Sequence, residues 1–103
     1  MVYNKLVRDK IPEIIEKNGG KCVCRTLNDE EYIAMIDAKL NEELVEYYEG
    51  KNIEELADLI EVIYAAAKAR GYTLDELEEV RAKKAEKRGG FDKKILLIES
   101  SDK

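Results

Sequence analysis

The chain has 103 residues, 40% of them charged, and a formal net charge of −5 at neutral pH. This length suits one domain with a modest core, and we expect a single domain over residues 1–103. The negative charge argues against a nucleic-acid partner, because such binding depends on attraction to phosphates. No apolar run reaches the length of a membrane span, no signal-peptide core is present, and two cysteines are too few for a disulfide framework. We therefore expect a cytoplasmic protein without a membrane partner.

The chain contains no histidine. This excludes Ser-His and Cys-His nucleophilic catalysis, histidine-ligated zinc and the Glu-x-x-His pairs of di-iron bundles. Carboxylate, lysine, arginine and tyrosine side chains remain for any chemistry that the protein performs.

Helical patterns dominate the chain, and the predicted fold class is mainly α: a small bundle of about four helices with two short strands. In chain order we expect a helix at 11–17, a strand at 21–27, helices at 29–50, 52–70 and 73–88, and a strand at 91–99. Capping boxes are predicted at Asn28 with Glu31, Asn52 with Glu55 and Thr73 with Glu76. The apolar segment 91–99 cannot stand alone in water, so we expect it to pair with segment 21–27 or with a neighbouring subunit.

Acidic residues recur at three-residue spacing on two successive predicted helices. Glu43 and Glu46 lie on the first of these helices, and Glu55 and Asp58 lie on the second. Residues three apart are neighbours on a helix surface, and the short turn at 50–52 folds the helices back on one another. The carboxylates then converge, and oxygen ligands of this kind suit Mg²⁺ or Mn²⁺.

The position of these acids relative to the apolar faces admits two interpretations. At about 100° per residue, Glu43 lies about 60° from the centre of the apolar stripe of its helix. Glu55 lies inside the stripe of the next helix, and Asp58 lies at its edge. Such carboxylates are costly unless they are paired or bind a metal, so either a metal site or a buried ion-pair network with Lys39 or arginines accounts for them. A capping role for Glu55 competes with a metal role.

The paired acidic motif and its flanks resemble a known family. The motif E-E-x-x-E at 42–46, followed by E-x-x-D at 55–58, is similar to the signature of the MazG-like, all-α nucleoside triphosphate pyrophosphohydrolases. The segments YNKLVRDKIPEII at 3–15 and RGGFDKKILL at 88–97 resemble the phosphoribosyl-ATP pyrophosphohydrolase-like branch of that superfamily. The resemblance spans nearly the whole chain.

This resemblance implies a Mg²⁺-dependent hydrolase that cleaves the α–β phosphoanhydride of a nucleoside triphosphate and clears the nucleotide pool. The implied metal ligands are Glu43, Glu46, Glu55 and Asp58. Either Glu42 or Glu46 is then the base that deprotonates the attacking water. Glu61, three residues after Asp58, is expected to support the site through hydrogen bonds.

Basic residues near both ends of the chain are candidates for contacts with the phosphates of a nucleotide. The first set is Lys5, Arg8 and Lys10, and the second set is Lys84, Lys87 and Arg88. The alternative is that these side chains form ordinary surface ion pairs.

The part of the third predicted helix, at 52–70, that runs from Glu54 to Ala67 is apolar over more than half of its circumference, which a small four-helix monomer would struggle to cover. We therefore expect a homo-oligomer, a dimer or a dimer of dimers. Two other functions stay open: the phosphoribosyl-ATP pyrophosphohydrolase of histidine biosynthesis, and a non-catalytic helical assembly module that binds Mg²⁺ or Ca²⁺ for stability. The base and sugar of the nucleotide are not specified by the sequence.

Overall fold

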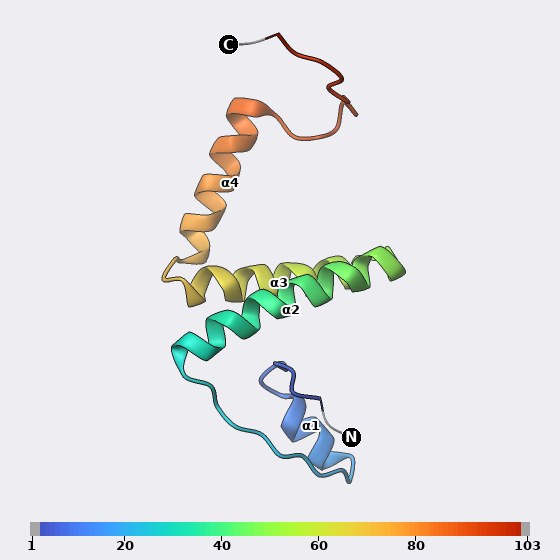
Figure 1. The fold of residues 1–103 in the computed structure, drawn as a ribbon, viewed down its shortest axis with the longest axis vertical. Helices are drawn as coiled ribbons and strands as arrows, with labels where there is room; N and C mark the ends of the chain where they lie inside the picture. The colour runs from blue at the N-terminus through green and yellow to red at the C-terminus, as the bar shows by residue number, and fades with distance from the viewer. Residues whose placement is uncertain (1–2, 102–103) are drawn as a thin grey trace. The chain divides into compact units, whose positions relative to one another are not determined.

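The computed structural model describes residues 3–101 of the chain. Within them lie four helices (Figure 1): α1 (Ile11–Lys17), α2 (Asp29–Gly50), α3 (Ile53–Ala69) and α4 (Leu74–Arg88). The four predicted helices and the mainly α class are therefore confirmed. The chain separates into two compact units, one ending at Tyr72 and the other beginning at Thr73. A single domain and a MazG-like bundle of all the helices stay predictions.

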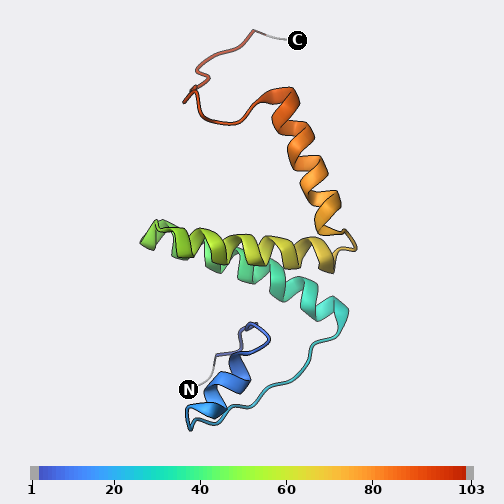
Figure 2. The ribbon, with the colours of Figure 1, turned by 180° about the vertical axis from the view of Figure 1, so that it is seen from behind.

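A tight turn joins α2 to α3 and folds them into an antiparallel pair, which lies side by side in both views (Figure 2). Lys51 ends α2 in the left-handed backbone region, at φ +51°, and donates its N–H to the Tyr47 carbonyl at 2.8 Å. Asn52 caps α3, because its side chain accepts the N–H of Glu55 at 2.9 Å. The turn places the carboxyl-terminal half of α2 beside the amino-terminal half of α3, where the acidic residues lie.

The contact between α2 and α3 forms the core of the first unit. Ile36 and Val62 are buried there, at 3% and 8% exposure. Glu43, at 7% exposure, is the one charged residue that the described part of the chain buries. Leucines of both helices, among them Leu44 and Leu59, line a cavity of about 400 Å³ along the same contact. The core is therefore small, and a carboxylate belongs to it.

One apolar side of α3 stays open to solvent in the described chain. Its exposed residues, between 38% and 78% accessible, are Ile53, Leu56, Ile60, Ile63 and Tyr64. This exposure agrees with the sequence argument for a homo-oligomer, which stays a prediction.

Local interactions dominate α4 in the second unit. Thr73 and Glu76 form the predicted capping box at its start, with bonds of 2.9 and 3.0 Å. Ion pairs along the helix join Glu78 to Arg81 at 2.6 Å and Glu79 to Lys83 at 2.8 Å. No residue of α4 is buried among the residues that the structure describes.

The two predicted strands are wrong for the described chain. Segments 21–27 and 91–99 contain neither strand nor helix there. Val23 is fully exposed, and the run from Ile95 to Ile98 is 76–84% exposed. An extended segment becomes a strand only when a partner supplies a ladder of hydrogen bonds, so β propensity alone was insufficient. Pairing of 91–99 with a neighbouring subunit stays a prediction.

In the part of the chain that the structure describes, no helix combines the length and apolar character that crossing a membrane requires.

Candidate metal centre

Glu43 is the innermost acid of the α2–α3 contact. Lys39, one turn earlier on α2, brings its Nζ to 3.4 Å from Glu43 Oε1. The other oxygen, Glu43 Oε2, is buried and has no hydrogen-bond partner within residues 3–101. A buried polar atom left without a partner costs about 1–3 kcal/mol, and more when it is charged. An oxygen in this position is available either to a cation or to a proton shared with a neighbouring carboxylate.

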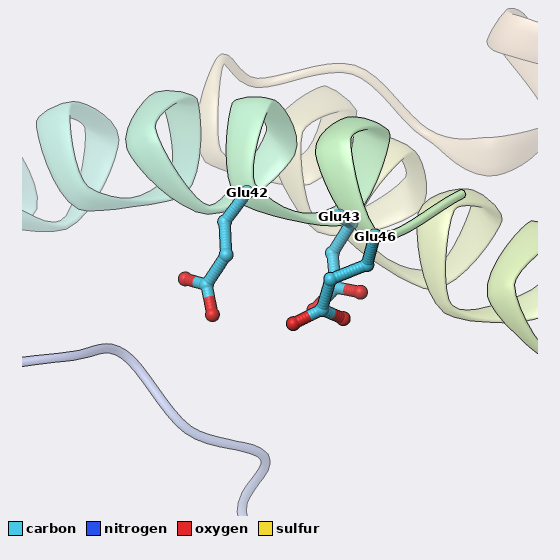
Figure 3. A group of neighbouring side chains, drawn as sticks. All are labelled: Glu42, Glu43 and Glu46. Carbon is cyan, nitrogen blue, oxygen red and sulfur yellow. The ribbon is translucent and has the colours of Figure 1, made fainter. Parts of the chain in front are cut away.

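Two groups of carboxylates share Glu43. Glu42 and Glu46 complete the first group on α2 (Figure 3), and Glu55 and Asp58 of α3 complete the second. In each group, one oxygen from every residue lies within 4.8 Å of the others. Oxygens about 2.1 Å from one Mg²⁺ lie at most about 4.2 Å apart across an octahedron. Small side-chain adjustments would bring either group to that spacing, so both fit a hard divalent cation.

Glu55 carries the second buried oxygen that lacks a partner in the described chain, its Oε2. The sequence predicted a capping box at the start of α3, but only one of its two hydrogen bonds forms. Asn52 accepts the N–H of Glu55 at 2.9 Å, whereas no return bond from the Glu55 carboxylate is found among the described residues. The competition between capping and ligation is thereby removed, and the carboxylate is available to the cluster.

Gly50, the last residue of α2, lies against the side chain of Glu55. A Cβ at Gly50 would lie 3.0 Å from Glu55 Cγ and 3.5 Å from Glu55 Oε1. Few side chains approach that closely, so an alanine would press Glu55 out of its present position. Sequence reasoning assigned Gly50 to the turn alone, because a contact made by a missing side chain has no sequence signature.

Two basic side chains of the N-terminal segment reach the cluster. Lys5 Nζ donates to Glu42 Oε1 at 3.0 Å, and Arg8 Nη2 donates to Asp58 Oδ1 at 2.7 Å. Both were predicted as phosphate contacts, and in this structure both contact carboxylates instead. The two basic side chains are 50% and 58% exposed, and their carboxylate partners are 27% and 42% exposed. Partly exposed ion pairs of this kind contribute little to stability.

The metal and ion-pair interpretations therefore apply to different atoms of one cluster. Lys39 Nζ lies 3.5 Å from Glu42 and 3.4 Å from Glu43. Glu42 and Asp58 have cationic partners, whereas the inner oxygens of Glu43 and Glu55 have none among the described residues. Ion pairing accounts for the rim of the cluster and leaves the interior oxygens of Glu43 and Glu55 available to a cation.

The environment shifts the pKa values of two adjacent glutamates in opposite directions. Burial, and next the neighbouring Glu46 carboxylate, raise the pKa of Glu43. The hydrogen bond from Lys5, with the nearby charge of Lys39, lowers the pKa of Glu42. The surroundings thus favour the charged form of Glu42 and disfavour the charged form of Glu43.

The remaining predicted site residues lie outside both carboxylate groups. Lys10, which precedes α1, and Glu61 on α3 are exposed. Lys84, Lys87 and Arg88 are exposed on α4 in the second unit. Their predicted roles in phosphate binding and in support of the site stay predictions.

Comparison with known proteins assigns no activity. A stretch of 42 residues, 41% of the chain, is 57% identical to an uncharacterised protein of Mycolicibacterium smegmatis. The chain covers 43% of the length of that relative. No family model matches the chain, and no solved structure matches it. The resemblance to MazG-like enzymes therefore depends on the motif residues themselves.

Proposed function

We propose that the protein is a Mg²⁺-dependent pyrophosphohydrolase that converts a nucleoside triphosphate into a nucleoside monophosphate and pyrophosphate. One observation carries the proposal: two buried carboxylate oxygens, Glu43 Oε2 and Glu55 Oε2, lack partners in the described chain and belong to one group of acids. The E-E-x-x-E and E-x-x-D motifs support the choice of reaction, because they resemble the signature of enzymes that cleave the α–β phosphoanhydride.

Glu43, Glu55 and Asp58 are the residues that would hold the cation. They supply only carboxylate oxygens from two packed helices, which is the donor chemistry that Mg²⁺ and Mn²⁺ prefer. When bound, the cation would neutralise charge on the phosphate oxygens of the nucleotide. Packing of α2 on α3 keeps water away from Glu43, so that its carboxylate is oriented before the nucleotide arrives.

Glu46 is our choice for the base that accepts the proton of the attacking water. Its carboxylate lies in the group formed with Glu42 and Glu43, and no lysine or arginine of the described chain pairs with it. Glu42 is the other sequence candidate. Its hydrogen bond from Lys5 lowers its pKa and makes it a weaker base.

A substrate panel tests this proposal. Nucleoside triphosphates and phosphoribosyl-ATP are assayed for pyrophosphate with Mg²⁺ and with a chelator, and phosphoribosyl-ATP covers the histidine-biosynthesis alternative. Glu43→Gln and Asp58→Asn are expected to lower kcat by about 100-fold or more, because each removes a charge that faces the cation. Glu79→Gln, an equal change on α4 outside both carboxylate groups, is the matched control and keeps the wild-type rate. Orthophosphate as the sole product, or an equal rate in chelator, would refute the proposal.

The exposed apolar side of α3 favours a second candidate, a non-catalytic assembly module stabilised by a divalent cation. Such a module shows a melting temperature that rises with Mg²⁺ or Ca²⁺ and no turnover on any member of the panel.

A further inference from the structure

The N-terminal segment packs on α2 before it enters α1. Asn4, Lys5 and Leu6 line a cavity of about 130 Å³ together with residues of α2, including Met35 and Glu42. Asn4 has a left-handed backbone, at φ +47°, which asparagine tolerates better than most residues. The segment thus has a defined conformation that brings its basic side chains to the acids.

The two ion pairs of this segment cross long stretches of sequence to reach different carboxylate groups. Lys5 and Glu42 are 37 residues apart, and Arg8 and Asp58 are 50 residues apart. Glu42 belongs to the group on α2, and Asp58 belongs to the group that includes α3. Together, the pairs place a positive charge at each of the two groups that share Glu43.

We infer that Lys5 and Arg8 are exchangeable counter-ions: a divalent cation displaces them from the carboxylates, and the freed groups then bind phosphate oxygens of the nucleotide. The inference depends on the proposed function, because it requires a cation at Glu43, Glu55 and Asp58. It adds direct competition between Arg8 and the metal for Asp58, and charge repulsion between the metal and Lys5 at the adjacent carboxylate group.

Burial and charge both favour the exchange. The side chains of Lys5 and Arg8 are 50% and 58% exposed, so their ion pairs are weak and are screened by salt. A divalent cation in the interior gains the oxygens of Glu43 and Glu55, which have no hydrogen-bond partner in the described chain. Repulsion between that cation and the nearby Arg8 guanidinium then drives the arginine outward. A phosphate can bind the freed guanidinium, because it accepts two parallel hydrogen bonds as a carboxylate does.

If Lys5 and Arg8 are exchangeable, removing their charges should raise the affinity for metal and lower the affinity for triphosphate. A purely structural role of the two residues would lower both affinities or change neither. In Lys5→Gln/Arg8→Gln, the metal no longer competes with the basic groups. Calorimetry should therefore show Mg²⁺ and Mn²⁺ binding about three- to tenfold more tightly than in the wild type. Inorganic triphosphate, titrated with Mg²⁺ in excess, should bind about tenfold more weakly, because its partners are gone. Arg8→Gln alone should show both changes to a smaller degree.

Arg25→Gln is the matched control. Arg25 pairs with Glu31 at 2.8 Å, is 68% exposed and lies outside both carboxylate groups. Its substitution removes the same charge and should leave both affinities within about twofold of the wild type.

Limited proteolysis reports the displacement without any nucleotide. Trypsin should cleave after Arg8 faster in Mg²⁺ than in chelator, while cleavage after Arg25 in the same chain stays constant. If the wild type binds Mg²⁺ but the double variant binds it equally tightly, or binds both Mg²⁺ and triphosphate more weakly, the exchange is refuted and the proposed function stands. If the wild type binds no divalent cation, the proposed function itself fails.

Discussion

On α4, Glu78 and Glu79 are more than 60% exposed, and each pairs with a cation of its own helix. On α2, the side chain of Glu43 is 9% exposed, and one of its oxygens has no partner in the described chain. Both helices are rich in acids at similar spacing. The difference is that α2 packs against α3, which removes water from one face of α2. An acidic residue becomes a candidate metal ligand when a neighbouring helix buries it. Three-residue spacing along the sequence does not by itself identify such a residue.

The two regions also differ in the interactions that keep them folded. The α2–α3 pair has apolar contacts between helices, centred on Ile36 and Val62. By contrast, α4 has a capping box, ion pairs within the helix and no buried residue in the described chain. We therefore expect substitutions in the core to affect the first region strongly, and substitutions of caps to affect the second locally.

The largest expected effect comes from the apolar contact of α2 with α3. Ile36→Ala should lower the free energy of unfolding by about 3 kcal/mol, because it leaves a cavity at a buried position of α2. Val80→Ala, at a residue of α4 that is 54% exposed, should change it by less than about 0.5 kcal/mol. Urea unfolding followed by circular dichroism measures both. Equal effects would contradict the contrast between the two regions.

A smaller effect is expected from the charge of Glu43. Because its pKa is raised above the usual value, the folded state binds its proton more tightly than the unfolded state, and the anion destabilises the fold at neutral pH. In chelator at pH 7, Glu43→Gln should therefore have a higher free energy of unfolding than the wild type.

The stability difference between Glu43→Gln and the wild type should depend on pH. As the pH falls through the raised pKa, wild-type Glu43 takes up its proton and its cost disappears. The advantage of Glu43→Gln should therefore shrink in thermal melts as the pH falls towards the ordinary pKa of a glutamate, and excess Mg²⁺ at pH 7 should reverse the order of the two proteins. Glu79→Gln on α4 provides the comparison. A glutamine variant less stable than the wild type in chelator at pH 7 would show that Lys39 already satisfies Glu43.

The smallest and most local effect is expected at the start of α4. Thr73→Ala removes the side-chain oxygen that accepts the N–H of Glu76 at 3.0 Å, a loss worth about 1 kcal/mol. Because α4 has few tertiary contacts to share this loss, its first turn should fray. Hydrogen exchange should accelerate for amides at the start of α4 and stay unchanged in α2 and α3. Uniform acceleration along the chain would mean that α4 and the helix pair unfold together.

Sequence reasoning succeeded where a signal is local and failed where a partner is needed. The caps at Asn28 and Thr73 and the helices that they open were predicted and are present. The strand at 21–27 was predicted from alternation and is absent from the described chain, because a strand requires a second strand to bond to. The sequence predicted that Glu43, Glu46, Glu55 and Asp58 converge. The structure brings Glu43, Glu55 and Asp58 together, whereas Glu46 lies in the group with Glu42 and Glu43. The contact of Gly50 with Glu55 was not foreseen.

By itself, the sequence determined the helices, their boundaries and the spacing of the acids, because these depend on hydrogen bonds and side chains only three or four residues apart. Tertiary structure alone decided which carboxylate is buried away from water and which carboxylate pairs with a basic side chain. Glu43 is buried because α3 covers it, and Arg8 meets Asp58 from 50 residues away. Burial and long-range ion pairing depend on the path of the whole chain, and they separate a candidate ligand from an ordinary surface acid.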